Sequence, residues 1–306
     1  MSTRRLGTEG PEVSVVGLGC NNFGGRVDLE GTRAVVDAAL ECGITLLDTA
    51  DTYSQGKSEE FLGQVLEGRR DRVVLATKFG KPMDGAPELP RGSRAYVRWA
   101  CDESLRRLRT DRIDVYQMHE PDERTPIEET LGALNELADE GKVRFLGSSN
   151  FDVAQIEEAD RVARERGLRR FVSAQNRYSL VRREAEDGLL QTCDRLGIGF
   201  LPYFPLESGL LTGKYRRGEP APPDSRLAGR DEWLTDEAFD RVEALERFAA
   251  ERGLSLLQVG IGGLAVMPAV SSVIAGATKP EQVRANAAAG DWQPSRDDLA
   301  ALLALR

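Results

Sequence analysis

The stretch Gly43-Ile44-Thr45-Leu46-Leu47-Asp48 joins a glycine to a short apolar run with a branched side chain at its start. Such a run is typical of a buried β-strand, and a glycine directly before it is typical of the left-handed turn that ends a preceding helix. Glycine stands at four further junctions of this kind, Gly68, Gly141, Gly167 and Gly197. The repeating unit is therefore predicted to be a helix, a glycine and a strand.

Eight runs of this type occur along the chain, at intervals of roughly 30 residues with one longer gap before the last. They are Val15–Gly19, Ile44–Asp48, Val73–Lys78, Ile113–His119, Val143–Ser149, Phe171–Gln175, Ile198–Tyr203 and Val270–Gly276. Capping-box sequences at Thr125–Glu128 and Ser255–Gln258 mark two of the helix starts between them. Eight strand and helix units predict an α/β fold, a parallel (β/α)8 barrel, because a doubly wound sheet usually stops at five or six strands.

Two segments fall outside this repeat. Short runs at Arg4–Leu6 and Val13–Val15 predict an N-terminal β-hairpin that covers the bottom of the barrel. Residues 205–230, after the seventh strand, are rich in glycine, proline and arginine and form a connection too long for an ordinary loop. We expect this connection to be a mobile lid, and the whole chain, residues 1–306, to form one barrel domain.

Composition and charge narrow the classes of partner and site. The chain has 41 lysine and arginine residues against 50 aspartate and glutamate residues, a net charge of −9, so neither a nucleic acid nor an anionic membrane is expected to bind. It has no run approaching the roughly 18 apolar residues of a membrane-spanning helix and no apolar leader, so we expect a soluble cytoplasmic protein. Four scattered cysteines and a single histidine, His119, argue against disulfides and against a metal site.

Polar residues stand where three consecutive strands are predicted to end, which is the rim that carries the chemistry in such barrels. Asp48 ends the second strand and Tyr53 follows in its loop. Lys78 ends the third strand and His119 the fourth. Each alone could be structural: an acid capping its turn, a phenol packed in a loop, a lysine on the rim, a satisfied core histidine. Together they predict one catalytic mouth, because burying four different polar groups at one rim without a purpose is costly.

The motifs around these residues resemble the aldo-keto reductase superfamily, in particular bacterial-type members related to channel β subunits. The first three are Leu47–Tyr53 (LDTADTY), Ala76–Gly80 (ATKFG) and Tyr116–Glu120 followed by Pro121 (YQMHEP). Further segments are similar to the cofactor-binding segments of that family: Gly147–Phe151, Ala174–Asn176, Pro202–Leu206, Gly209–Tyr215 and Gly276–Asn286. The resemblance extends from the hairpin to Asn286.

The resemblance implies a reductase that binds NADPH across the barrel mouth and passes a hydride to the carbonyl of an aldehyde or ketone, reversibly. Tyr53 would be the proton donor, Lys78 would lower its pKa, Asp48 would pair with Lys78, and His119 would orient the carbonyl oxygen. Moving a phenol from about 10 toward 7 needs roughly 4 kcal/mol. A cation about 4 Å away supplies roughly that amount at an effective dielectric near 20.

The resemblance also implies where the cofactor is held. Ser149, Asn150 and Gln175 would hold the carboxamide, and Tyr203 would stack on the nicotinamide unless it is an ordinary core aromatic. The other implied cofactor residues are Gly19, Cys20, Asn21, Phe204, Leu206, Ser208, Lys214, Arg226, Gly276, Thr278, Gln282 and Asn286, with Lys214 and Arg226 at the pyrophosphate and the last three at the adenosine end. Preference for NADPH would depend on Lys279, Arg284 or lid residues. The substrate, a small carbonyl compound, would contact Asn21, Asn22, Phe23, Phe79 and the lid.

Two departures from the family pattern concern the cofactor. Ala275 stands where many relatives have proline, and Phe204 stands where a small hydroxyl residue is common. Two other functions remain open: a nucleotide-binding redox sensor or regulatory subunit with little turnover, and a Schiff-base aldolase that uses a neutral Lys78. The oligomeric state is left open as well.

Overall fold

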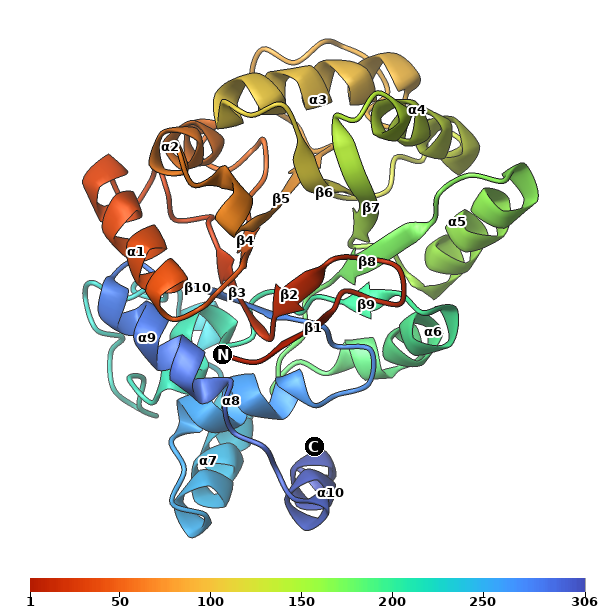
Figure 1. The fold of residues 1–306 in the computed structure, drawn as a ribbon. Coiled ribbons are helices and arrows are strands. Elements are labelled where there is room, and N and C mark those ends of the chain that lie inside the picture. Colours follow the sequence, from red (N-terminus) through yellow and green to blue (C-terminus); the bar gives the residue numbers. More distant parts are fainter. Residues whose placement is uncertain (306) are drawn as a thin grey trace.

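The structure is a computed structural model that describes residues 1–305. Eight parallel strands form one sheet in the order β10-β3-β4-β5-β6-β7-β8-β9, and Figure 1 shows them curled around a common axis. Their bounds are β3 (Val16–Gly19), β4 (Leu46–Asp48), β5 (Val74–Phe79), β6 (Ile113–Met118), β7 (Val143–Ser149), β8 (Phe171–Gln175), β9 (Gly199–Phe200) and β10 (Val273–Gly276). All eight predicted strands are present.

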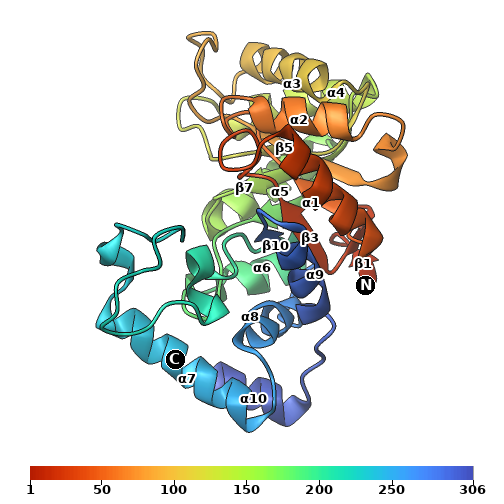
Figure 2. The same ribbon diagram turned by 90° about the vertical axis from the view of Figure 1, so that its left-hand side faces the viewer.

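Helices surround the strands and complete the (β/α)8-type architecture, as predicted. They are α1 (Leu29–Glu41), α2 (Lys57–Val65), α3 (Arg94–Leu108), α4 (Ile127–Asp139), α5 (Val153–Arg166), α6 (Leu189–Leu196), α7 (Asp236–Glu251), α8 (Leu256–Ala265), α9 (Pro280–Ala289) and α10 (Arg296–Ala304). In both ribbon views α7 and α10 lie outside α8, away from the strands (Figures 1 and 2). None of the helices in residues 1–305 combines the length and apolar character that crossing a bilayer requires.

The local signals for helix ends are mostly confirmed. The five junction glycines have φ angles between 64° and 77°, the left-handed region that favours glycine. Ser255 forms the predicted capping box with Gln258. The capping box at Thr125 is wrong, because α4 begins at Ile127 with Pro126 as its N-cap, and the Thr125 hydroxyl instead donates to Asp122.

The seventh strand, β9, is shorter than predicted. Pro202 lacks an amide proton and so interrupts the ladder within the expected range Ile198–Tyr203. The two ends of the sheet are joined through isolated parallel bridges, Phe200 with Val270 and Tyr203 with Ile274. The barrel wall therefore has one weakly bonded seam, between β9 and β10.

The N-terminal hairpin is present and lies where the sequence predicted. Its strands β1 (Thr3–Arg5) and β2 (Glu12–Ser14) pair antiparallel, and they cross the end of the barrel that faces the viewer in Figure 1. Leu6 and Val13 are fully buried and pack with the apolar side chains that fill the barrel interior. The hairpin therefore closes the end at which the strands begin.

The long connection after β9 lies at the opposite end of the molecule from the hairpin (Figure 2). It contains two short 3-10 helices, Glu207–Thr212 and Asp231–Trp233. Arg177 forms an ion pair with the buried Glu207, and its guanidinium lies over the ring of Trp233, 4.7 Å from the ring centre. Through these two contacts, Arg177 attaches both ends of the connection to the loop after β8. The mobility of the lid stays a prediction.

Candidate active site

The side chains predicted to react lie at the end of the barrel where β4, β5 and β6 finish. Asp48 is the last residue of β4, Lys78 lies one residue before the end of β5, and His119 directly follows β6. Tyr53 stands in the loop between β4 and α2. Because parallel strands end at the same rim, residues far apart in the sequence meet here.

Lys78 is fully buried, and its ammonium connects the acid with the phenol. Nζ donates to Asp48 Oδ2 at 2.7 Å and to the backbone oxygen of Thr49 at 2.8 Å. It lies 3.4 Å from the hydroxyl oxygen of Tyr53, which is a long hydrogen bond. The structure therefore brings Asp48, Lys78 and Tyr53 together.

The charge of this group is set by burial and by the ion pair. Burial disfavours the charged form of Lys78, but Asp48 and Tyr53 together outweigh burial and raise the pKa of Lys78. Burial is also the largest influence on Tyr53 and raises its pKa, while Lys78 acts to lower it. Lys78 therefore acts on Tyr53 in the predicted direction, but burial exceeds the effect of the lysine, so the pKa of Tyr53 is raised rather than lowered. At neutral pH Lys78 is a cation and Tyr53 keeps its proton.

The loop that carries Tyr53 continues into a left-handed turn. Ser54, Gln55 and Gly56 have φ angles of 50°, 56° and 84°. Such angles are uncommon for serine and glutamine, so the surrounding structure must impose them. The backbone amide of Ser58 donates to the carbonyl of Tyr53 at 3.3 Å and closes the turn against α2. The position of Tyr53 is thus fixed by the backbone on its C-terminal side.

His119 is buried and neutral. Burial, followed by the charges of Lys78 and Lys81, lowers the pKa of His119 to about 2. Its ring meets the ring of Tyr53 edge to face, with centroids 6.0 Å apart. Nδ1 has no hydrogen-bond partner within the described part of the chain. A neutral imidazole can still donate one hydrogen bond to a ligand.

A second group of buried ionisable side chains lies behind the Tyr53 loop. Glu59 is fully buried and accepts hydrogen bonds from Arg107 Nε at 2.7 Å and from the Thr77 hydroxyl at 2.5 Å. Asp51 is 1% exposed, and neither of its carboxylate oxygens has a hydrogen-bond partner among residues 1–305. Burial, followed by the charge of Glu59, raises the pKa of Asp51 to about 8.

Asp51→Asn is expected to stabilise the protein at alkaline pH. The raised pKa means that the folded chain holds the proton of Asp51 more tightly than the unfolded chain, so this residue makes stability fall between about pH 4 and about pH 8. An amide does not titrate, so the variant should gain a few kcal/mol at pH 8 relative to wild type and little at pH 4. Urea unfolding at both pH values measures the difference.

The exposed Asp297→Asn, on α10, is the matched control and should show no such pH-dependent gain. An Asp51→Asn gain that is equal at both pH values would contradict the assignment of a raised pKa.

The residues predicted to hold the nicotinamide end lie together beside this group. The Tyr203 hydroxyl donates to Asn150 Oδ1 at 2.8 Å, and Asn150 Nδ2 donates to the backbone oxygen of His119 at 2.9 Å. The Ser149 hydroxyl donates to the backbone oxygen of Gln175, and Gln175 Nε2 donates to Asp48 Oδ1 at 2.9 Å. Tyr203 is half-buried at the rim, so its ring is not a closed core aromatic.

The predicted lid residues follow Tyr203 directly. Phe204, Leu206 and Ser208 are half-buried, and the ring of Phe204 lies 5.1 Å below the guanidinium of Arg226. Lys214 lies so close to Gly209 that a side chain there would collide with the ammonium. Burial, followed by the charges of Arg26 and Arg230, lowers the pKa of Arg226. Lys214 and Arg226 are thus cations of the lid itself, and Arg26 and Arg230 lie close enough to act on Arg226.

The remaining predicted cofactor residues surround the ends of β3 and β10. Gly19 and Gly276 are direct partners in the sheet, and Asn21 lies beside Gly276. Gln282 accepts from the amide and the hydroxyl of Thr278, and Asn286 Nδ2 lies 3.5 Å from the backbone oxygen of Gly276. Cys20 is fully buried, its backbone amide donates to the backbone oxygen of Asp48, and its backbone oxygen accepts from the Ser58 hydroxyl, so the structure exposes no part of it to a ligand.

The expected substrate walls need correction at three positions. Asn22 is buried and its side-chain amide donates to the backbone oxygen of Ala277, and Phe23 and Phe79 are fully buried. Phe79 packs against Tyr116, with ring centroids 4.7 Å apart, and both phenylalanines belong to the core between strands and helices. Neither can form an open wall, because apolar side chains at these positions are consumed by packing.

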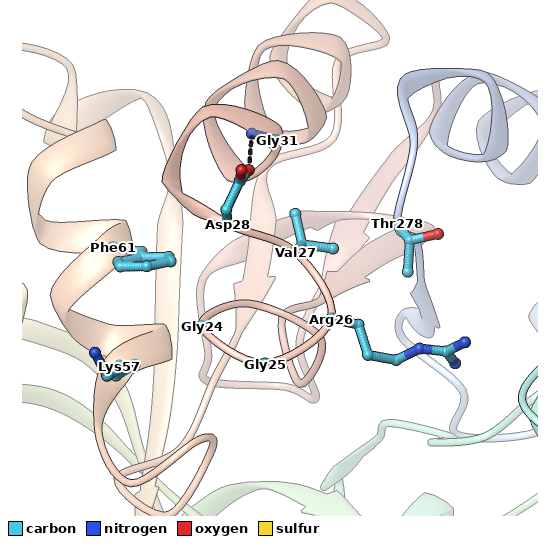
Figure 3. Close-up of a pocket in the computed structure, with 9 residues that line it drawn as sticks. All are labelled: Gly24, Gly25, Arg26, Val27, Asp28, Gly31, Lys57, Phe61 and Thr278. Atoms are coloured by element: carbon cyan, nitrogen blue, oxygen red, sulfur yellow. Dashed lines mark hydrogen bonds between the residues drawn. The ribbon is translucent and has the colours of Figure 1, made fainter.

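A surface pocket of about 470 Å³ lies next to the adenosine-side residues (Figure 3). It is lined by the loop 24–28, by Gly31, by Lys57 and Phe61 of α2, and by Thr278. Arg26 extends from this loop toward Thr278 (Figure 3), and its guanidinium donates to the backbone oxygen of Asp224 in the lid at 3.3 Å. None of Asp48, Tyr53, Lys78 and His119 lines this pocket.

Sequence reasoning missed three contributors. Gln117, fully buried, donates from Nε2 to Asp48 Oδ1 at 3.2 Å. The only sequence signal for it is an amide inside a strand that, apart from Asp114, is apolar or aromatic. Thr49 acts through its backbone oxygen, which leaves no side-chain signal. Arg26 could have been noticed as the one cation in a glycine-rich loop after the first strand.

Comparisons with known proteins agree with this architecture. The sequence model of the Aldo/keto reductase family matches residues 15–306. A probable voltage-gated potassium channel subunit beta from Oryza sativa subsp. japonica is 36% identical over 96% of this chain and 92% of the relative. An uncharacterized oxidoreductase, YqkF, from Bacillus subtilis is 35% identical over 94% and 90%, and L-glyceraldehyde 3-phosphate reductase from Escherichia coli is 32% identical over 94% and 86%. The chain therefore belongs to the aldo/keto reductase family.

Proposed function

We propose that this protein is an NADP(H)-dependent oxidoreductase that reduces the carbonyl of an aldehyde or ketone and oxidises the alcohol in reverse, with Tyr53 as proton donor. The observation that carries the proposal is the contact of one buried ammonium, Lys78, with both the Asp48 carboxylate and the Tyr53 hydroxyl. Lys78 and the neutral His119 flank Tyr53. A protonated phenol between a cation and a neutral donor suits general acid catalysis at a carbonyl oxygen.

Unpaired cations at the mouth support a polyanionic cofactor. Arg26, Lys214, Arg226 and Lys279 form no ion pair with any carboxylate whose side chain the structure describes, although most arginines elsewhere on the surface do. In a chain of net charge −9 carboxylates are abundant, so unpaired cations around one opening favour an anionic ligand. Pyrophosphate and the adenosine phosphate would lie against these cations, and Ser149, Asn150, Gln175 and Tyr203 would hold the nicotinamide end. Bound NADPH would supply the hydride.

The chain's own residues then handle the proton. Tyr53 keeps its proton at neutral pH and would give it to the carbonyl oxygen as negative charge develops there. Lys78 stays charged and would stabilise the phenolate that remains, while Asp48 holds Lys78 in place. His119 would donate a hydrogen bond to the same oxygen.

The direct test is to measure the consumption of NADPH, as the fall in its absorbance, with a panel of aldehydes, ketones and quinones. The panel should include a triose phosphate, since one relative is named L-glyceraldehyde 3-phosphate reductase. Turnover of at least one carbonyl compound supports the proposal. Tight NADPH binding with no consumption would instead favour the regulatory function, which the names of the plant channel subunit relatives suggest. A Schiff-base aldolase is disfavoured, because Asp48 keeps Lys78 protonated.

Arg226→Gln is expected to raise the Kd for NADPH by at least about tenfold, the factor for losing one charge-assisted hydrogen bond. The half-buried guanidinium has no carboxylate partner within the described chain, so a ligand phosphate is the contact that it would lose. Fluorescence titration with NADPH measures the change. Arg247→Gln removes an exposed arginine on α7 that likewise pairs with none of the described carboxylate side chains, and should leave the Kd within about twofold. Equal effects of the two variants would contradict the assignment.

A further inference from the structure

The two oxygens of Asp48 have different partners. Oδ2 accepts from Lys78 at 2.7 Å. Oδ1 accepts from Gln175 Nε2 at 2.9 Å and from Gln117 Nε2 at 3.2 Å. The carboxylate thus lies between the cation beside Tyr53 on one side and two buried amides on the other.

Gln117 is locked in place inside the barrel. It lies on β6 with no exposed surface, and its Oε1 accepts from the Ser173 hydroxyl at 3.4 Å and from Gln175 Nε2 at 3.5 Å. The neighbouring strand β7 makes room with Gly147, where a Cβ atom would lie 2.8 Å from Gln117 Cγ and 2.3 Å from Ser173 Oγ. We expect a fully buried amide with these partners, closely packed against Gly147, to keep one orientation.

Gln175 belongs to the same hydrogen-bonded layer as Gln117 and Asp48. Because Gln175 Nε2 donates to Asp48 and to Gln117, its amide nitrogen is already engaged. Its Oε1 is then the atom left to accept a hydrogen bond from a ligand amide. One hydrogen-bonded layer therefore connects a cofactor-side amide with the carboxylate that holds Lys78.

We propose that Gln117 is a positioning residue, which orients Asp48 and Gln175 together and so couples the Lys78 and Tyr53 pair to the nicotinamide side. The inference rests on the proposed function, since it assigns Gln117 a part in that reaction. Without the amide of Gln117, the Asp48 carboxylate loses a donor on Oδ1 and can rotate away from Lys78. The cation beside Tyr53 would then be held less rigidly during proton transfer.

Gln117→Met tests this directly, because methionine has a similar length and cannot donate. We expect kcat for the fastest carbonyl substrate of the panel to fall at least about tenfold, as for loss of a hydrogen bond to a charged group, with a smaller change in the Kd for NADPH. The pH at which alcohol oxidation is half-maximal should also shift. Asn135→Met removes a buried side-chain amide of α4 that contacts none of Asp48, Gln117 and Gln175, and its turnover should stay within about threefold of wild type.

Gln117→Glu keeps the shape of the side chain and serves if the methionine variant does not fold. Its carboxyl group, when protonated, can donate to Asp48 as the amide does, and when ionised it repels Asp48. Activity near wild type at low pH, lost on a new titration as pH rises, is the expected result. A purely structural Gln117 would change the Tm and leave both pH profiles unaltered.

Tyr53→Phe in the same assay separates the two failures. If Tyr53→Phe loses activity while folded Gln117→Met keeps both the kcat and the pH profile of wild type, the inference about Gln117 is wrong and the proposed function stands. If Tyr53→Phe also keeps wild-type turnover, the proposed function itself fails.

Discussion

Tyr53→Phe is expected to lower carbonyl reduction by at least about a hundredfold, the contribution typical of a general acid. The phenyl ring keeps the edge-to-face contact with His119, and only the hydroxyl that lies 3.4 Å from Lys78 Nζ is removed. The Kd for NADPH should therefore change by less than about threefold. Steady-state turnover and NADPH titration on the same preparation measure both quantities.

The control for this variant is Tyr96→Phe. Tyr96 lies on α3 with its ring buried and its hydroxyl 3.5 Å from the backbone oxygen of Lys81, outside the group around Lys78. It should lose little activity. A folded Tyr53→Phe protein that reduces carbonyls at the wild-type rate would exclude Tyr53 as the proton donor.

Lys78→Met is expected to reduce both stability and activity. The substitution leaves the Asp48 carboxylate 2% exposed without its cation, and removing one partner of a buried pair typically costs about 3–5 kcal/mol. Turnover should fall at least about a hundredfold, since the charge beside Tyr53 is lost. Urea unfolding and steady-state kinetics measure the two effects.

The double variant Asp48→Asn with Lys78→Met makes this prediction specific. It removes both charges, so much of the lost stability should return while the activity stays low. If the double variant is no more stable than Lys78→Met alone, the buried pair is not the source of the cost.

Most of the fold was accessible from local sequence. An apolar run such as Ile44–Asp48 after a glycine predicts a strand, and eight such runs leave few alternatives to a barrel. The apolar pattern around Pro202 predicts too long a seventh strand, because it does not register the amide proton that proline lacks. The false capping box at Thr125 has a similar cause: the hydroxyl found a nearer acceptor in Asp122.

The candidate site was accessible only in part. Asp48, Lys78 and His119 could be placed at one rim because strand ends converge, and the structure brings them together with Tyr53. The net pKa of Tyr53 could not be predicted, because desolvation depends on packing from several elements. Gln117 was missed for a related reason, since its partners come from β4 and β8 and leave no local pattern.

The seam between β9 and β10 is the part of the barrel wall that is joined only by isolated bridges. Lys78 lies on β5, about half-way round the sheet from this seam, where continuous ladders join β4, β5 and β6. The lid instead begins at β9, beside the isolated bridges. If the lid moves as predicted, we expect the displacement at its base to be taken up where the wall has few backbone hydrogen bonds. The spacing of Asp48, Tyr53 and Lys78 would then be kept while a large ligand enters or leaves.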